Sequence, residues 1–266
     1  MPGTDNSGVS RRLLLRRRVS RRVKPWAAGA LVSGAVLAAV LTMGATHAPR
    51  WESVGPGIEH RFLDARDVQA DLVRFDLERF NPTLEIPGAA GPLTAAGLAK
   101  SHNVVAAING GFFDPQWRPL GLRVSQGHVR SPLRSRADWG VFFTRAGRAR
   151  IVHTSEYEPH PADETAIQVG PRLLIDGAAV KLKPQVAYRS ALAVGHEGRQ
   201  LTLVSTAVPV DANALAHALE RLGEFDSALL LDGGPSAQLF VQTGTFAIDR
   251  PGAYGVPDLL VMQPRH

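Results

Sequence analysis

Residues 227–240 read SALLLDGGPSAQLF, and this stretch decides how the fold is interpreted. An apolar run ends at Asp232, two glycines, a proline and a serine, and then turns apolar again. A strand that is apolar on both faces is typical of the centre of a sheet. The loop that follows is either an ordinary tight turn or a backbone left open so that a ligand can approach closely.

A second stretch, VVAAINGGFFD at residues 104–114, has the same form. Each apolar run follows a candidate helix and ends in a polar side chain with two glycines, Asn109-Gly110-Gly111 and Asp232-Gly233-Gly234. If the two strands run parallel, both loops emerge at one sheet edge, where open sheets form ligand crevices. Bare glycine N–H groups would suit an anion there, and Ser236, at a possible helix start after Pro235, would add a hydroxyl.

The rest of residues 49–266 indicates hairpins with a few helices. A half-buried strand, with partly alternating apolar and polar residues, is expected at 68–77 and ends at Asn81-Pro82, and a last strand is expected at 258–262. Helices are expected within 91–102, capped by Thr94, and within 211–223, capped by Asp211. Four dipeptides fit hairpin turns in which glycine supplies a positive φ: Gln126-Gly127, Ala146-Gly147, Asp176-Gly177 and Glu197-Gly198. The pattern predicts an α+β fold, a single domain with a mixed, largely antiparallel sheet and a few packed helices.

The N-terminal quarter has a different character. Residues 1–25 are basic, and residues 26–45 carry no charge. This order predicts a cytoplasmic basic segment (1–25), then a signal peptide or transmembrane anchor (26–48), a linker (49–64) and a domain (65–266). The basic flank stays in the cytoplasm. The domain is therefore expected outside the cytoplasmic membrane, either secreted or anchored through the N-terminal segment.

The charge distribution argues against nucleic acid as a partner. The sequence pI is about 10.3, yet residues 1–25 hold eight basic residues against one acid, out of a formal net charge of +6. The remaining chain is close to −1, so it has no electrostatic reason to bind phosphate polymers. The chain has no cysteine, which excludes disulfides, thiolate nucleophiles and zinc-thiolate sites.

Four motifs together resemble the phosphodiester glycosidase family: INGGFFD (108–114), QVGPRLLIDG (168–177), YRSALAVG (188–195) and LLLDGGPSAQL (229–239). The resemblance covers residues 65–264. It implies an exported hydrolase that cleaves the glycosidic bond of a sugar-1-phosphodiester, in cell-envelope or exopolysaccharide metabolism. The chain departs from the family pattern at Pro235 and Ala237, and it lacks an arginine directly before the last strand, where Arg250 is a candidate substitute.

The implied reaction assigns roles to the motif residues. A phosphate leaving group, with a second pKa near 6, needs cations and N–H donors more than a strong acid. Arg189 is the first candidate for the phosphate and Arg123 the second. A developing oxocarbenium ion calls for a carboxylate, for which Asp232 and Asp114 are the candidates. The remaining predicted substrate contacts are Asn109, Gly110, Gly111, Gly233, Gly234 and Ser236.

Other side chains have weaker claims on the site. Phe112, Phe113 and Trp117 can form an apolar wall for a sugar face, although aromatic residues after a strand are more often core. His128 and His196 are further candidates for a catalytic base. No metal-ligand motif is present, and no metal or cofactor is expected.

Two other functions remain open. One is a carbohydrate- or phosphate-binding envelope protein that keeps the crevice without catalysis, which the departures at Pro235 and Ala237 favour. The other is a membrane-anchored structural protein, in which neither glycine loop lines a pocket. Both catalysis and binding require the two glycine loops to meet.

Overall fold

The computed structural model describes residues 50–87, 91–101 and 104–265. Ala48–His266 forms one compact unit. The predicted basic segment and the predicted signal or anchor at 26–48 lie outside the described residues. Within the described ranges, no helix has the length and apolar character needed to cross a bilayer.

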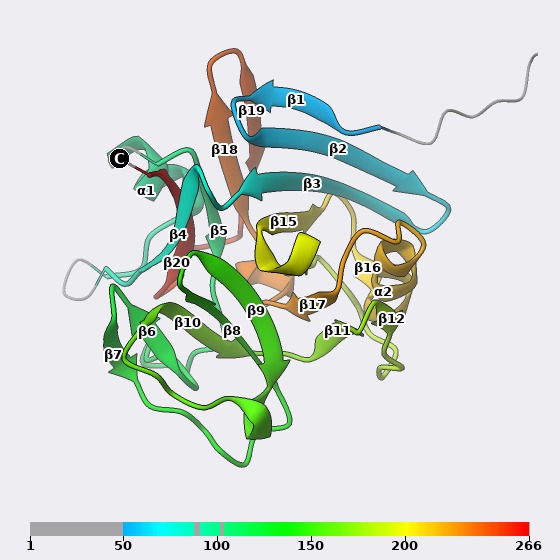
Figure 1. Ribbon diagram of the computed structural model, residues 1–266. Coiled ribbons are helices and arrows are strands. Elements are labelled where there is room, and N and C mark those ends of the chain that lie inside the picture. The colour runs from blue at the N-terminus through cyan, green and yellow to red at the C-terminus, as the bar shows by residue number, and fades with distance from the viewer. Residues whose placement is uncertain (1–49, 88–90, 102–103, 266) are drawn as a thin grey trace, which may run out of the picture. The chain divides into compact units, whose positions relative to one another are not determined.

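The largest sheet has eight strands in the order β1-β2-β3-β15-β14-β17-β11-β12 (Figure 1). In chain order these strands are β1 Glu52–Gly55, β2 Ile58–Ala65, β3 Val68–Asp76, β11 Arg172–Ile175, β12 Ala178–Ala179, β14 Ser190–Gly195, β15 Gln200–Thr206 and β17 Ser227–Leu230.

Two five-stranded sheets and a short ribbon complete the β-structure. One has the order β19-β18-β5-β20-β4, with β4 Phe80–Glu85, β5 Ala106–Asn109, β18 Leu239–Thr243, β19 Phe246–Arg250 and β20 Leu259–Pro264. The other has the order β7-β6-β10-β8-β9, with β6 Arg123–Ser125, β7 His128–Ser131, β8 Gly140–Arg145, β9 Arg148–His153 and β10 Asp163–Val169. The ribbon pairs β13 Val186–Ala187 with β16 Val210–Asp211.

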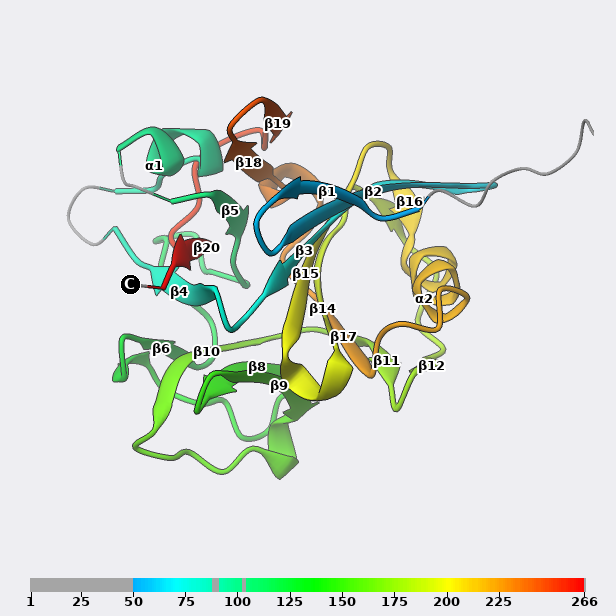
Figure 2. The same cartoon turned by 45° about the horizontal axis from the view of Figure 1, so that its top comes forward.

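The α-helices of the described residues are α1 Ala95–Ser101 and α2 Ala212–Glu220, and the short 3₁₀ turns are η2 Thr154–Glu156, η3 His196–Gly198 and η4 Gly234–Ser236. Figure 2 shows α1 beside β5 and α2 on the side of β11, β12 and β16, in agreement with their contacts. The predicted caps are confirmed. Thr94 Oγ1 accepts from the Gly97 N–H at 3.0 Å, and the Asp211 side chain accepts from the Asn213 N–H.

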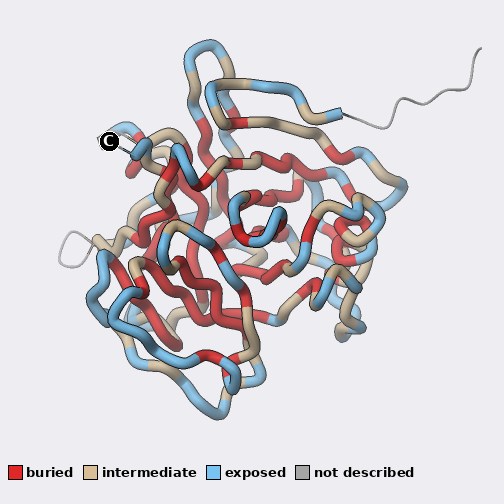
Figure 3. Tube along the Cα trace, viewed as in Figure 1, coloured by how far each residue is buried: buried red, intermediate tan, exposed pale blue. Residues whose placement is uncertain are grey.

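Strand β17, which carries the apolar run before Asp232, is buried on both faces, as its composition predicts. Leu229 joins a core shared by all three large sheets, whereas its neighbours Ala228 and Leu230 join a second core beneath α2. β5 is also covered on both sides, because Ile108 lies in the shared core and Ala107 packs toward α1. The buried segments of Figure 3 follow these central strands.

The four predicted hairpin turns are all present. They connect β6 to β7, β8 to β9, β11 to β12 and β14 to β15, and both residues of each dipeptide have positive φ. Glycine adopts this conformation without steric cost at the second position.

Three predictions about the fold are corrected. The fold is mainly β rather than a balanced α+β, and its strands are divided among several sheets instead of forming one. The predicted linker at 49–64 forms β1 and most of β2, which pair with each other and with β3. Asn81-Pro82 does not end the strand region, because both residues lie within β4. β4 is an edge strand, where proline is tolerated.

Candidate active site

The two glycine loops meet. The Asp232 N–H donates to the Gly110 carbonyl at 3.1 Å, and Asn109 Nδ2 donates to the Asp232 carbonyl at 2.8 Å. The strands that precede the loops do not lie side by side in one parallel sheet, because β5 and β17 belong to different sheets. The site is therefore a junction between two sheets and not the edge of one.

The two glycines of the Asn-Gly-Gly sequence leave room for a buried ion pair between Arg123 and Asp258. The distance from Arg123 Nε to Asp258 Oδ2 is 3.0 Å. A Cβ on Gly110 would lie 1.6 Å from Asp258 Oδ1, and a Cβ on Gly111 would lie 2.5 Å from Arg123 Nη2. Both glycine N–H groups donate to Asp258, one to its carbonyl and one to its carboxylate. The expectation that this loop offers uncovered N–H groups to an anion is therefore corrected.

Asn109 is fully buried and joins the two loops instead of facing a ligand. Its Nδ2 donates to the Asp232 and Gly110 carbonyls, and its Oδ1 accepts from the Gln238 N–H at 3.0 Å. These bonds use both amide hydrogens, so none remains for the substrate hydroxyls that the sequence assigned to it. We interpret Asn109 as a positioning residue.

Arg123, the second predicted phosphate contact, is completely buried. Besides Asp258, its guanidinium donates to the Gln168, Leu122 and Phe112 carbonyls at 3.1 to 3.2 Å. A phosphate would have to displace these bonds to reach it. Arg123 therefore supports the loops from beneath, and a direct phosphate contact is not available in this arrangement.

Asp232 is half-buried at the start of the second loop. Its Oδ1 accepts from the Gly233 N–H at 3.0 Å. Burial raises the pKa of Asp232 above its ordinary value, assisted by the charge of Asp258, while hydrogen bonds from Ser236 and Gly233 act in the opposite direction. A carboxylate with a raised pKa in a cleft is typical of a general acid or base, or of a nucleophile.

The backbone after Asp232 makes a tight turn against Tyr188. The Gly234 N–H donates to the Tyr188 carbonyl at 2.8 Å, and Gly234 has φ +60°. A Cβ on Gly233 would approach the same carbonyl to 3.0 Å. The helix expected after Pro235 is only the three-residue 3₁₀ turn η4, so it adds no helix dipole at Ser236. Ser236 itself is buried beside this turn.

Arg189 is the cation of this junction. Its side chain is buried, and its Nη1 lies 3.6 Å from the position that a Cβ on Gly233 would occupy. Nε donates to the Val210 carbonyl at 3.4 Å and Nη2 to that of Gln185. Within the described residues, no carboxylate lies within 4.0 Å of its guanidinium. Burial lowers the pKa of Arg189, and the charge of Asp211 acts in the opposite direction, so the cost of desolvating this cation is only partly offset.

Asp114 is bound within its own loop. Its carboxylate accepts from the Arg118 N–H and Nε and from the Gln116 N–H, at 2.7 to 3.0 Å. These bonds, the Arg118 N–H first, hold the pKa of Asp114 below its ordinary value. They are the bonds of a turn-stabilising aspartate. A catalytic role for Asp114 stays a prediction, and it would require the carboxylate to leave Arg118.

An aromatic wall does form, although with different members. Phe113 stacks on Trp117 with centroids 5.1 Å apart, and Trp117 meets Tyr254 edge-on at 5.8 Å. The Tyr254 hydroxyl lies 3.4 Å from Ser236 Oγ, which places this wall beside the second glycine loop. Phe112 packs instead against Trp139.

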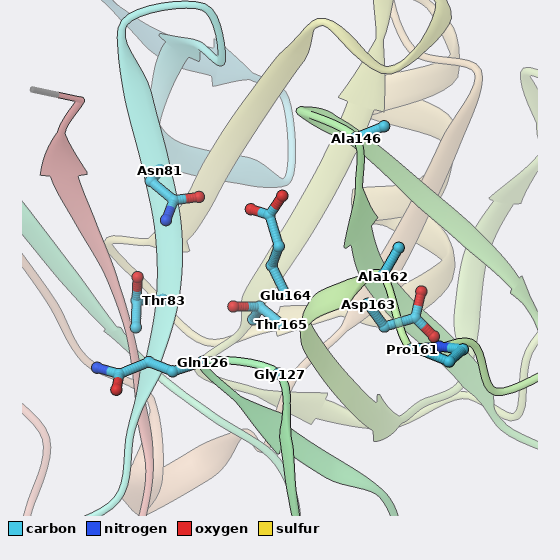
Figure 4. Close-up of a pocket in the computed structure, with 10 residues that line it drawn as sticks. All are labelled: Asn81, Thr83, Gln126, Gly127, Ala146, Pro161, Ala162, Asp163, Glu164 and Thr165. Carbon is cyan, nitrogen blue, oxygen red and sulfur yellow. The ribbon is translucent and has the colours of Figure 1, made fainter.

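Two larger pockets have different relations to the loops. One, of about 690 Å³, is lined by Tyr188, Gly234 and Pro235 and so adjoins Asp232. The other, of about 480 Å³, lies among β4, β10 and the β6–β7 turn. Figure 4 shows the residues that line it, which include Asn81 and Glu164. It contains none of the predicted site residues. We therefore place the candidate site beside the first pocket.

The two histidines considered as catalytic bases lie away from the glycine loops. His128 is an exposed residue of β7 that contacts the Gln126 carbonyl, and His196 lies in the exposed η3 turn. Among the described residues, no three His, Asp or Glu side chains group closely enough to hold a metal ion.

Sequence reasoning missed Asp258, Tyr254 and Gln238. An aspartate placed directly before the wholly apolar run LLVM was a signal, because a carboxylate that starts a buried strand needs a buried partner. Gln238 accepts from the Ala95 N–H at 2.7 Å and so ties α1 to the second loop. No local pattern marks it.

The comparisons with known proteins agree with the resemblance. The family model described as phosphodiester glycosidase matches residues 102–262. An Escherichia coli K12 protein described as uncharacterized protein YigE is 26% identical over 150 residues, which cover 52% of this chain and 59% of that protein. The match thus spans less than two thirds of that relative's length.

Two solved structures share the fold. The catalytic domain of zebrafish N-acetylglucosamine-1-phosphodiester alpha-N-acetylglucosaminidase, described as auto-inhibited by its pro-peptide, aligns with a TM-score of 0.60 at 18% identity, covering 82% of this chain and 87% of that one. A hypothetical protein from Synechocystis aligns with a TM-score of 0.60 at 16% identity, covering 82% of this chain and 64% of that one. At these identities the likeness concerns the fold alone.

Proposed function

This chain belongs to the phosphodiester glycosidase family, and from that premise we propose that it hydrolyses the glycosidic bond of a sugar-1-phosphodiester. The products are the free sugar and a phosphomonoester. The observation that carries the proposal is the placement of Asp232 and Arg189 on either side of Gly233: a carboxylate with a raised pKa precedes it, and the guanidinium of a buried arginine lies beside it.

Arg189 supplies the phosphate contact. A buried guanidinium that has no carboxylate within 4.0 Å among the described residues gains most from an anion that can accept two parallel hydrogen bonds, as phosphate does. As the glycosidic C–O bond breaks, negative charge develops on the departing phosphate. A cation already fixed beside that oxygen stabilises the transition state without having to reorganise.

Asp232 acts on the sugar side. In its ionised form it either stabilises the developing oxocarbenium ion or removes a proton from the attacking water. Water adds its oxygen to the anomeric carbon, the phosphomonoester leaves with the bonding electrons, and the proton from water passes to the carboxylate and then to solvent. The leaving phosphate has a low pKa, so the second carboxylate that protonates an ordinary leaving group is not needed.

The domain is proposed to work outside the cytoplasmic membrane, in cell-envelope or exopolysaccharide metabolism. The support is the basic segment at 1–25 followed by the uncharged stretch at 26–45, which has the order of a signal peptide or an N-terminal anchor.

A second candidate function is a non-catalytic receptor for sugar phosphates. One observation favours it: the carboxylate of Asp114 is committed to Arg118, which leaves Asp232 as the free member of the two carboxylates predicted for catalysis. Such a receptor would use Arg189 for the phosphate and the aromatic wall for the sugar.

The test is to incubate the whole protein with a panel of sugar-1-phosphodiesters and measure the reducing sugar released. Asp232→Asn is expected to lose turnover by a factor of 100 or more (about 10² to 10⁴ for loss of a general base) while retaining ligand affinity. Asp67→Asn, at an exposed turn between β2 and β3, is the matched control and should retain full activity. No turnover of any substrate by the parent protein, with binding intact, would favour the receptor.

A further inference from the structure

The pocket beside Asp232 has walls drawn from distant parts of the chain. They comprise β13 with Tyr188, the end of β15, the η4 turn, and residues 249–253 at the end of β19. Its volume of about 690 Å³ lies within the range of small-molecule sites, which are mostly apolar with a few placed polar groups. No catalytic or phosphate-binding side chain lines it, so its role is separate from the chemistry itself.

The walls are largely apolar. Valine, alanine and proline side chains provide most of the lining: Val186, Ala187, Pro209, Pro235, Ala237 and Pro251. Val186 is 67% exposed, and Tyr188 is 47% exposed. A sugar chain or a nucleotide placed against such walls would lose hydrogen bonds to water without replacing them, whereas an apolar chain would gain from leaving water.

The charges of the lining cancel. Asp249 and Arg250 are its charged residues, and Arg250 is already bound to Asp71 through a 2.8 Å contact from Nε to Oδ2. The walls therefore do not attract a polyanion. A buried cation lies just beyond them, because Arg189 directly follows Tyr188, and its N–H donates to the hydroxyl of Thr206, another lining residue, at 2.9 Å.

A mostly apolar pocket beside one buried cation is complementary to an amphiphile with a single anionic head. We propose that this pocket holds the aglycone of the substrate and that the aglycone is a long apolar chain, alkyl or isoprenyl, as in a glycosyl phospholipid. The inference rests on the proposed function. The sugar lies at Asp232, the phosphate at Arg189, and the chain between β13 and residues 249–253. Hydrolysis then releases the sugar and an apolar phosphomonoester.

Turnover tests the inference directly. The substrates are phosphodiesters of one sugar with methyl, butyl and octyl aglycones, kept below their critical micelle concentrations. We expect kcat/KM to rise with chain length, by up to about fourfold for each methylene group that becomes buried. Equal kcat/KM for the methyl and octyl substrates would overturn the inference and leave the proposed function standing.

A matched pair of variants locates the effect. Val186→Gln places a polar group in the pocket wall, and Val129→Gln makes the same change at a valine of β7 that is 66% exposed and does not line the pocket. Both sites are exposed, so neither variant should disturb folding. Val186→Gln should reduce kcat/KM for the octyl substrate at least fivefold and leave that for the methyl substrate unchanged. An equal loss in Val129→Gln would overturn the inference.

Binding separates the two proposals. Calorimetry with octyl phosphate and methyl phosphate needs no turnover, and octyl phosphate should bind at least tenfold more tightly, with the preference reduced in Val186→Gln. If octyl phosphate shows this preference but no phosphodiester is cleaved, the proposed function fails and the pocket assignment stands. If the two phosphates bind alike, the pocket assignment fails whatever the turnover.

Discussion

Asn109 Nδ2 donates to the backbone carbonyl of Asp232 at 2.8 Å, across 123 positions of sequence. This bond fixes the loop that carries the candidate catalytic carboxylate to a strand of another sheet. Asn109→Ala would leave the Asp232 carbonyl and the Gln238 N–H without partners in a buried setting. We expect a loss of about 2 to 4 kcal/mol in the free energy of unfolding, since each unpaired group costs about 1 to 3 kcal/mol.

Urea denaturation measures this loss, and Asn81→Ala is the control. Asn81 Oδ1 has no hydrogen-bond partner in the described structure, so its removal should cost less than about 1 kcal/mol. Equal losses in the two variants would show that the bond to Asp232 does not hold the loops together.

Gly110→Ala should destabilise the protein by about 3 kcal/mol, because the new Cβ would lie 1.6 Å from Asp258 Oδ1 and force the buried ion pair to move. Gly55→Ala provides the comparison. Its Cβ would meet Ile58 Cδ1 at 3.5 Å, an ordinary contact. Thermal unfolding should show a clearly lower Tm for the first variant only, and a native-like Tm for Gly110→Ala would contradict the packing described here.

Replacing only one partner of the ion pair between Arg123 and Asp258 should lower the free energy of unfolding substantially. Arg123→Met leaves a buried carboxylate without its cation, and losing one partner of a buried pair costs about 3 to 5 kcal/mol. Arg118→Met removes the exposed partner of Asp114, where the side chain is 73% exposed, and should cost less than about 1 kcal/mol.

The double variant Arg123→Met with Asp258→Leu separates charge from packing. Compared with Arg123→Met alone, it removes the stranded carboxylate and additionally leaves the Gly111 N–H without its acceptor. It should therefore be more stable than Arg123→Met alone, as judged by the midpoint of urea unfolding. A double variant less stable than the single one would show that packing, not the stranded charge, dominates.

The pH dependence of turnover should identify the catalytic carboxylate. Burial raises the pKa of Asp232 above 3.8, whereas hydrogen bonds hold that of Asp114 below 3.8. If ionised Asp232 is required, kcat/KM falls on the acid side with a midpoint above 3.8. A midpoint below 3.8 would assign the carboxylate role to Asp114 instead.

The same shift makes Asp232 a cost to folding. When folding raises the pKa of a carboxyl, the free energy of unfolding decreases as the pH rises from the ordinary pKa through the raised pKa. The cost is therefore fully present at neutral pH. Asp232→Asn should raise Tm at pH 7, by about 2 to 4 °C for each kcal/mol relieved, and the advantage should vanish below pH 3.8. A lower Tm at neutral pH would show that the carboxylate is stabilising.

The sequence predicts local features of this fold well. The positive-φ turns, the caps at Thr94 and Asp211, and the two-sided burial of residues 227–230 each follow from a few neighbouring residues. The two glycine loops meet as predicted, but not through the parallel strands on which the prediction rested, because β5 and β17 belong to different sheets. The division of the strands into three large sheets was not, because apolar periodicity shows which face is buried but not which strand lies beside it.

The candidate site was less predictable for the same reason. Arg123 and Arg189 are both arginines beside apolar runs, yet one is neutralised by Asp258 and the other lacks a carboxylate partner in the described structure. Asp258 lies 135 residues from Arg123 along the chain. Only the tertiary fold shows that the glycines of the first loop accommodate this pair, and so separates an arginine with a buried carboxylate partner from one with no carboxylate within 4.0 Å among the described residues.

The bond from Asn109 to Asp232 also bears on how the protein matures. On the ribosome, Asn109 is made 123 residues before its acceptor exists, and the long-range pairings that surround it are of the kind that form slowly. Any nascent chain that stops before Asp258 lacks the partner of Arg123 as well. We therefore expect the activity proposed for the site to appear abruptly, only once residue 258 has been added and the loops can be fixed.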